Sequence, residues 1–432
     1  MSATTLLIAV FGLAAAVGLG WLAVEGINRR PIAGAFALFG WLAALTLFID
    51  TPEVFVWNIG GINVVAADVI CAFLALIAGL RLLRGFVHIS KPLAVPLIIF
   101  IAMLGLSYAR GLPAFGLQHA TNEFREFFYF LAALGFVLSF PFERLGEKLL
   151  LVGVVGGATL AAVALIRLPM MGGITMDARP VPSYSALVIG QGFFTGWFWL
   201  KTGRRLKLWR WLIFALLPFS FLMLHRSVWM ALAGGLAAVL AWDRAGRGGL
   251  LKTLVIGGVV GAVLIGLVAG DKIMLALDQA VEEATSSEES TFIWRLEGWE
   301  ALLRQESGWN FVDLAIGRPM GSGYARTLGN SVVNTAEIES GVIPHNYYLS
   351  MLLRGGVVGL VAFVGLYLKL GKILRRAAVR STPSVYPAAF LTLLVTQMIY
   401  YVPYSADFIQ GLFLGGAVML ANSLTQPHEA RS

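Results

Sequence analysis

Residues 149–166 read LLLVGVVGGATLAAVALI and contain no charged side chain. At a rise of about 1.5 Å per residue, a helix of this length is about 27 Å long. That length approaches the hydrocarbon core of a bilayer, which is about 30 Å thick. Lys148 precedes the block and Arg167 follows it. The block therefore predicts one membrane-spanning helix with a cation at each end.

Apolar blocks of similar length recur along the whole chain of 432 residues, which is 58% hydrophobic and only 13% charged, with a mean hydropathy of +0.80. So few charges would not cover the surface of a soluble protein of this size. We expect an all-α polytopic membrane protein with about 12–13 transmembrane helices. The predicted spans are residues 4–24, 33–49, 64–80, 92–108, 124–140, 149–166, 183–200, 209–225, 228–242, 253–269, 346–368, 385–402 and 407–423.

Basic residues occupy every second connection between these blocks. Because cytoplasmic connections carry an excess of Lys and Arg, we assign this side to the cytoplasm, which puts the N-terminus outside and the C-terminus inside. The first block lacks the basic region that begins a signal peptide, so we interpret it as a retained span; if it is cleaved or interfacial, twelve spans remain. The basic connections hold Arg29 and Arg30; Arg81, Arg84 and Lys91; Arg144 and Lys148; Lys201, Arg204, Arg205, Lys207 and Arg210; Arg244, Arg247 and Lys252; and Lys369, Lys372, Arg375, Arg376 and Arg380.

The net charge of +8 follows from these connections, and no folded basic domain is present that would bind nucleic acid. We therefore expect membrane lipids as neighbours and no nucleic-acid partner. Cys71 is the single cysteine and lies inside an apolar block. One cysteine forms neither an intrachain disulfide nor a thiolate metal site.

One long connection, residues 270–345, separates ten spans in residues 1–269 from the C-terminal spans in residues 346–432. The alternation of charge assigns it to the periplasmic side. Helical spacing of its apolar residues predicts an amphipathic helix over 292–303, lying on the membrane or on the spans. A glycine-rich stretch from Gly317 to Gly323 predicts a tight loop. The apolar positions of the helix are Phe292, Leu296, Trp299 and Leu303.

Arginine dominates the cations on the outward side. Its planar guanidinium grips phosphate oxygens with two parallel bonds and keeps its charge, although a lone arginine at a span end also serves as a simple anchor. Arg226 lies at a tight turn, Arg179 lies in a Gly/Pro-rich loop, and Arg125 begins a span beside Glu126, a potential partner. These three arginines are our candidates for binding a phosphate-bearing ligand, and a polyprenyl diphosphate fits because its chain lies in the bilayer.

His345 closes the long loop in Pro344-His345-Asn346-Tyr347-Tyr348-Leu349, at the mouth of a span. An imidazole with a pKa near neutral accepts a proton from a sugar hydroxyl, which makes His345 a candidate general base. A histidine at a helix end also has ordinary structural roles. Glu337 and Glu339 precede it closely and are rival bases.

The stretch formed by His345, Asn346, Leu349, Leu352, Gly356, Gly359 and Leu360 resembles the motif that closes the periplasmic loop in the O-antigen ligase and O-antigen polymerase superfamily. Three further pieces are similar to that family. Arg295 with Trp299 resembles its Arg-x-x-x-Trp, and Gly317 to Gly323 resembles its glycine-rich loop. Arg226-Ser227 resembles its outward Ser/Arg turn, with the order of the two residues reversed. The resemblance covers roughly residues 175–365.

This resemblance implies a GT-C-like fold and a metal-independent, inverting glycosyltransferase of the bacterial inner membrane, active on the periplasmic face. Its donor would be a glycan on undecaprenyl diphosphate, with no cofactor and no metal. The acceptor would be lipid A-core in a ligase, our first hypothesis, or another lipid-linked repeat unit in an O-antigen or exopolysaccharide polymerase. His345 would be the base, and Arg226 and Arg179 would hold the diphosphate. Asn346, Arg295 and Glu339 would position the acceptor or the loop.

A transporter of lipid-linked glycan is the alternative from another class. It favours charged residues near the bilayer midplane and repeated halves. Asp68 and Arg354 are the only Asp, Glu, Lys or Arg residues that lie more than two residues inside a predicted span, and we find no internal repeat. A peptidoglycan-type polymerase would lack the His-Asn closure of the loop.

Overall fold

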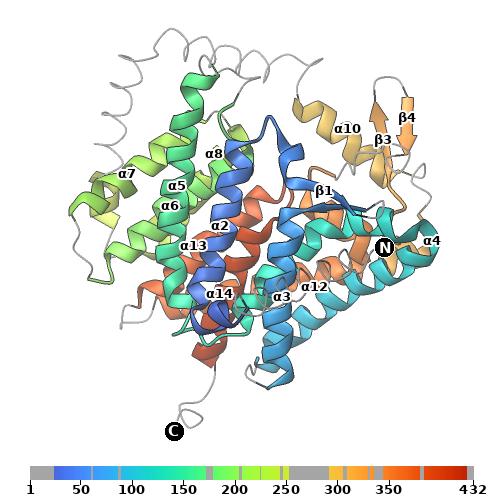
Figure 1. Ribbon diagram of the computed structural model, residues 1–432. Helices are drawn as coiled ribbons and strands as arrows, with labels where there is room; N and C mark the ends of the chain where they lie inside the picture. The colour runs from blue at the N-terminus through green and yellow to red at the C-terminus, as the bar shows by residue number, and fades with distance from the viewer. Residues whose placement is uncertain are drawn as a thin grey trace, which may run out of the picture.

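The computed structural model shows that the chain is mostly helical (Figure 1). The described residues are 24–59, 62–85, 89–171, 179–203, 207–223, 225–243, 247–252, 291–304, 309–328, 331–334, 344–379 and 384–425. Within these ranges, five helices are long and apolar enough to cross a membrane, and four apolar helices are shorter. The expectation of an all-α membrane protein is confirmed at this level. The predicted spans at 4–24 and 253–269 lie outside the described residues.

Two short β-hairpins and two 3₁₀ turns lie in the connections between the described helices. The first hairpin, β1–β2, is antiparallel with Val56 opposite Val65, and the second, β3–β4, pairs Ala325 with Asn334. The helices are α2 (Pro31–Leu47), α3 (Ala66–Leu83), α4 (Lys91–Leu138), α5 (Leu149–Met170), α6 (Ser183–Leu200), α7 (Lys207–Leu222), α8 (Arg226–Trp242), α10 (Thr291–Leu303), α11 (Phe311–Ile316), α12 (Tyr347–Ala378), α13 (Val385–Tyr400) and α14 (Phe408–Thr425). The strands are β1 (Val56–Ile59), β2 (Ile62–Val65), β3 (Ala325–Leu328) and β4 (Ser331–Asn334), and the 3₁₀ turns are Pro52–Phe55 and Gly146–Lys148.

Glycine lets neighbouring helices pack closely. A Cβ atom on Gly157 of α5 would lie 2.9 Å from the Cα atom of Gly192 of α6. Likewise, a Cβ atom on Gly411 of α14 would lie 2.3 Å from the carbonyl oxygen of Phe130 of α4. Lipid tails are as apolar as the helices, so close van der Waals contact between small residues stabilises such bundles.

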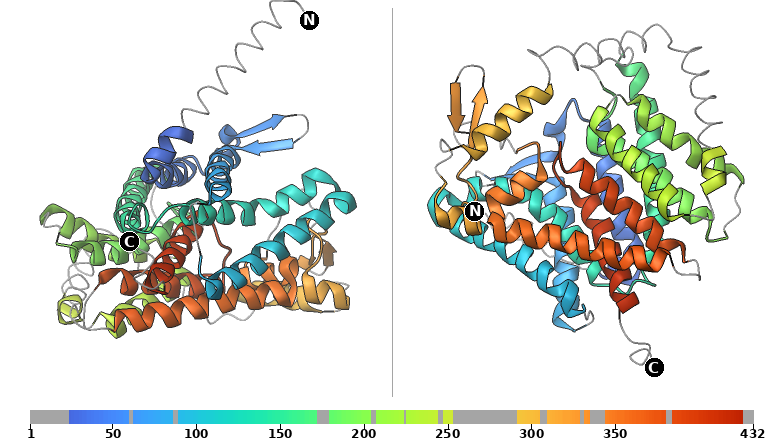
Figure 2. Two further views of the ribbon diagram at one scale, coloured as in Figure 1. Left: turned by 90° about the horizontal axis from the view of Figure 1, so that it is seen from below. Right: turned by 180° about the vertical axis from the view of Figure 1, so that it is seen from behind.

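Contacts between connections follow the predicted alternation. At the basic end, Arg81 donates to the Asn28 side chain at 2.8 Å, and Arg144 donates to the Asn28 carbonyl at 3.0 Å. At the other end, Arg167 pairs with Asp50 at 2.9 Å. α10 and the β3–β4 hairpin lie together at one end of the molecule, and α14 leaves at the opposite end (Figures 1 and 2). The chain therefore has two distinct faces.

The predicted spans 92–108 and 124–140 belong to one helical stretch, α4, rather than being separated by an irregular connection. Only Gly116 leaves helical geometry, with φ 81° and ψ 165°, and the two arms of α4 meet there (Figure 2, left). The intervening segment packs on the glycine-rich loop. A Cβ atom on Gly111 would lie 2.1 Å from the Met320 carbonyl oxygen.

The predicted span 346–368 is likewise corrected, because α12 is broken at Gly356 (φ 64°, ψ −172°). Gly317, which has φ 83°, packs against the backbone at this break. A Cβ atom on Gly356 would lie 2.3 Å from the Ala315 carbonyl oxygen, and one on Gly317 would lie 2.3 Å from that of Arg354. Two glycine backbones therefore cross here, where any side chain would clash.

Replacing Gly356 by Ala tests this crossing. The added Cβ atom meets a backbone oxygen and the positive φ is strained, so we expect a loss of about 2 kcal/mol or more in the free energy of unfolding. Gly365→Ala on the same helix is the matched control, because its Cβ atom would meet nothing within 4 Å. That control should raise stability by about 0.5–1 kcal/mol. Equal melting temperatures of the two variants in detergent would contradict the crossing.

Candidate functional site

Segments that are distant in the sequence meet around the ring of Tyr404, in the connection between α13 and α14, and His225 joins them through its contact with Arg179. The guanidinium carbon of Arg295 (α10) lies 4.9 Å from the centre of that ring. The His345 ring, just before α12, stands at 85° to it with 6.5 Å between centres. Tyr404 stacks on Tyr400, with ring centres 4.9 Å apart. We call Arg179, His225, Arg295, His345 and Tyr404 the Tyr404 cluster.

Backbone hydrogen bonds hold the start of α12 against this connection. The N–H of Tyr347 donates to the carbonyls of Tyr401 at 2.9 Å and Tyr404 at 3.0 Å. The side chain of Asn346 caps the helix, because its Oδ1 atom accepts from the N–H of Leu349 at 3.1 Å. His345 is therefore the exposed residue immediately before a fixed helix start, and the Asn346 cap accounts physically for the His-Asn pair.

Arg179 is oriented by His225. The Nε2 atom of His225 lies 2.8 Å from the Val181 carbonyl oxygen, and its Nδ1 atom lies 3.1 Å from Nη1 of Arg179. A carbonyl oxygen only accepts, so Nε2 carries the proton and Nδ1 accepts from Arg179. Burial lowers the pKa of His225 to about 4, helped by Arg179 and opposed by the bond to Val181. The ring is therefore neutral at pH 7 and holds the guanidinium in place.

Arg295 brings positive charge to the Tyr404 ring. Burial raises the pKa of the Tyr404 hydroxyl, but the charge and hydrogen bond of Arg295, with contributions from Ser183 and Arg179, outweigh burial, and the pKa lies below its usual value. The Nε atom of Arg295 and the Nε1 atom of Trp299 are buried donors without a hydrogen-bond partner among the described residues. A buried donor without a partner costs about 1–3 kcal/mol.

Asp407 lies three residues after Tyr404 and immediately precedes α14. Its Oδ1 atom accepts from the N–H of Ile409 at 2.7 Å, whereas its buried Oδ2 atom has no partner among the described residues. Burial raises the pKa of Asp407 to about 7, against the lowering by its bonds from Ile409 and Gln410. Near neutral pH this carboxyl is therefore protonated in a large fraction of molecules.

Arg125 has structural partners instead. Its Nε atom pairs with Asp68 at 3.0 Å and its Nη2 atom donates to the Asn63 carbonyl at 2.6 Å, so it ties α4 to α3 and the β1–β2 hairpin. Asp68 also accepts from the N–H of Val65 at 2.8 Å, in the first turn of α3. Asp68 thus lies at a helix end rather than at midspan, which removes an observation that favoured a transporter.

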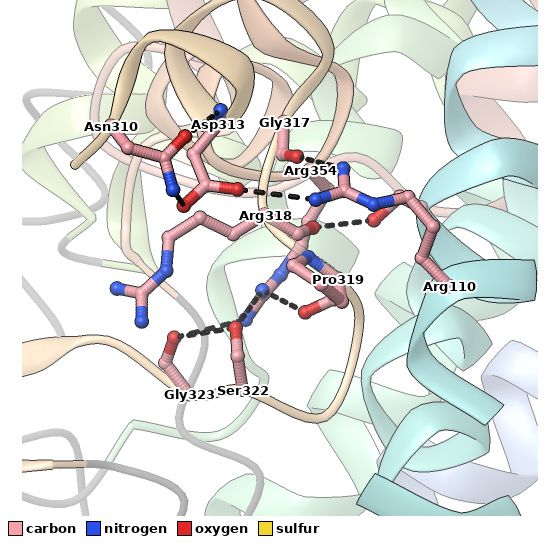
Figure 3. Close-up of polar contacts among 10 residues, drawn as sticks. Arg110, Asn310, Asp313, Gly317, Arg318, Pro319, Ser322, Gly323 and Arg354 are labelled. Atoms are coloured by element: carbon pink, nitrogen blue, oxygen red, sulfur yellow. Dashed lines mark hydrogen bonds and ion pairs between the residues drawn. The ribbon is translucent and has the colours of Figure 1, made fainter. Parts of the chain in front are cut away.

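Arg354 and the glycine-rich loop form a second polar group (Figure 3). Arg354 donates to the Pro319 carbonyl at 2.8 Å and to Oγ of Ser322 at 2.7 Å, and it pairs with Glu123 at 2.6 Å. Glu123 in turn accepts from the N–H groups of two loop glycines: Gly321 and Gly323. Nearby, Arg110 donates to the Gly317 carbonyl at 2.6 Å and pairs with Asp313 at 3.2 Å. These arginines clamp the loop.

Of the remaining predicted residues, Arg226 lies within the described part of the chain and the two glutamates do not. Arg226 is the first residue of α8, directly after His225, and is half-buried. Glu337 and Glu339 lie outside the described residues. Sequence reasoning missed Tyr404 and Asp407 as neighbours of the site. The signal for them is the run Tyr-Val-Pro-Tyr-Ser-Ala-Asp at 401–407, which is polar and aromatic and lies between two predicted spans.

Comparison with known proteins adds no relative: no family model and no curated protein sequence matches the chain. Inferences about function therefore rest on the residues and their geometry.

Loss of Arg354 tests the clamp. Its side chain is 5% exposed and Glu123 would be left as an uncompensated charge, so Arg354→Gln should cost about 3–5 kcal/mol of stability. Arg29→Gln breaks an exposed pair with Glu25, in which the side chains are 77% and 40% exposed, and should cost less than about 0.5 kcal/mol. Thermal unfolding in detergent measures both, and similar losses would refute the clamp.

The pH dependence of stability tests the His225–Arg179 contact. The pKa of His225 is about 4 in the folded chain against 6.5 for the free group, so the unfolded chain binds more protons between these values. The contribution of the neutral His225 ring to the free energy of unfolding is therefore complete above pH 6.5. It is lost as the pH falls toward 4, and the total loss approaches about 3 kcal/mol. His225→Gln should have a flatter profile than the wild type, whereas exposed His119→Gln should keep the wild-type slope. A wild-type slope in His225→Gln would exclude the neutral ring.

Proposed function

We propose that this protein is a bacterial inner-membrane glycosyltransferase with a GT-C-like fold. In this proposal it moves a glycan from undecaprenyl diphosphate to an acceptor hydroxyl on the periplasmic face. The favoured activity is O-antigen ligase, with lipid A-core as the acceptor. The same chemistry with a lipid-linked repeat unit as the acceptor would make it an O-antigen or exopolysaccharide polymerase.

The observation that carries the proposal is the convergence of His345, Arg295 and Arg179 on Tyr404, with Arg179 held by His225. One imidazole is exposed, and two guanidinium groups approach from connections more than a hundred residues apart. Permanent cations suit a diphosphate, and an exposed imidazole suits the deprotonation of a hydroxyl. Buried donors of Arg295 and Trp299 without partners among the described residues add capacity for oxygen ligands.

The proposed reaction is a single displacement. His345 takes the proton of the acceptor hydroxyl, and the oxygen attacks the anomeric carbon of the donor sugar. The bond from that carbon to the diphosphate oxygen breaks, with inversion at the carbon. Arg179, Arg226 and Arg295 then stabilise the negative charge that develops on the leaving diphosphate.

Replacing His345 tests the base. Loss of a general base lowers a rate by about 10²–10⁴-fold, so His345→Ala should reduce release of undecaprenyl diphosphate by that factor. The assay uses purified full chain in vesicles with a lipid-linked glycan donor and either lipid A-core or a second donor molecule as the acceptor. His119→Ala, the exposed histidine on α4, is the matched control and should keep wild-type turnover.

Several outcomes separate the alternatives. Full transfer by His345→Ala together with its loss in Glu339→Gln would assign the base to Glu339. Transfer to lipid A-core favours the ligase, and lengthening of the lipid-linked glycan favours the polymerase. Movement of intact donor across the vesicle without release of diphosphate lipid would reject the transferase in favour of a transporter.

A further inference from the structure

A cavity of about 540 Å³ lies between α8, α12 and α13, away from the Tyr404 cluster. Tyr367 and Met398 line one end, and Lys372, Arg375 and Arg376 line the other. Aliphatic side chains form the walls between these ends. Leu368, at 63% exposure, is among them. The cavity therefore combines an apolar channel with a cationic mouth.

The three cations share one face of α12, because they are spaced i, i+3 and i+4. All three are exposed, and none forms an ion pair with any residue that the structure describes. Asp243, which follows the lining residue Trp242 in the sequence, is engaged by Lys201 and by the Trp197 indole at 2.8 Å. Like charges at this spacing repel one another, so the mouth favours an anion.

The cavity is closed at its apolar end. The Tyr367 hydroxyl donates to Gln397 at 3.2 Å and lies 3.0 Å from the Tyr401 hydroxyl, all three side chains being buried. None of the residues that line the cavity belongs to the Tyr404 cluster. Residues 367–376 cover about 13 Å of helix, which matches the upper part of an acyl chain and is far shorter than a polyprenyl chain.

We propose that this groove binds an anionic phospholipid of the surrounding bilayer. Its phosphate lies among Lys372, Arg375 and Arg376, and one acyl chain follows Leu368 and Gly371 toward Tyr367. These cations lie in the last two turns of α12, which the charge pattern places at the headgroup level of the more basic membrane face. A basic cluster that serves only to set the orientation of the chain in the membrane would need no apolar groove beside it. This site is independent of the proposed glycosyl transfer.

Gly371→Phe tests the apolar half without changing the charge. Gly371 lines the groove and a Cβ atom there would meet nothing within 4 Å, so the new ring fills the channel. Gly365→Phe on the same helix is the bulk-matched control, since Gly365 is equally open and does not line the groove. Native mass spectrometry of the full chain, from micelles doped with phosphatidylglycerol or phosphatidylcholine, measures the retained lipid. We expect Gly365→Phe to keep the phosphatidylglycerol preference and Gly371→Phe to lose it.

A second pair of variants tests the charge. One cation near the membrane surface contributes about fivefold in lipid binding, so Arg375→Gln with Arg376→Gln should lower phosphatidylglycerol retention by about twenty-fold or more. Arg84→Gln with Lys148→Gln removes two exposed cations of the same predicted face outside the groove and should leave retention unchanged. Equal loss in both pairs, or wild-type retention in the groove variants, would overturn the proposal. Stronger retention of added undecaprenyl phosphate than of phosphatidylglycerol would also overturn it, in favour of a carrier site.

Discussion

The requirement that backbone polar groups be satisfied within the chain governs this structure. Where lipid replaces water, an unpaired N–H or carbonyl costs several kcal/mol, so a helix is broken only where protein supplies the missing partners. The break of α12 at Gly356 obeys this rule. The N–H of Arg318 donates to the Leu353 carbonyl at 2.7 Å, and Gly317 fills the space beside the break. Arg354 then fixes the loop that supplies these groups.

The same requirement places the candidate site. The N–H of Tyr347 at the start of α12 is satisfied by the carbonyls of Tyr401 and Tyr404, beyond the end of α13. That bond brings His345 beside the Tyr404 ring, and the Asn346 cap fixes the direction in which the chain enters the helix. The exposed imidazole is therefore positioned by backbone hydrogen bonds, while its own ring stays accessible to a ligand.

Hydropathy predicted the helical class and most of the described spans, because burial in lipid selects for apolar composition over a fixed length. Hydropathy carries no information about backbone geometry. Gly356 is one of 49 glycines, and only its partner Gly317 makes it a break. Within the site, Arg125 and Arg179 look alike as outward arginines. Asp68, a carboxylate 57 positions away, gives Arg125 its structural role. The local sequence around either residue does not predict this pairing.

The partners of the arginines separate structural roles from a binding role. Arg110, Arg125, Arg167 and Arg354 each contact a carboxylate in the protein, so their charges are compensated within the fold. Arg295 contacts a tyrosine ring and has no ion-pair partner among the described residues. Cation–π contact compensates a guanidinium less fully than a carboxylate does. Positive potential therefore remains near His345 at the Tyr404 ring, where the proposed reaction would release its diphosphate.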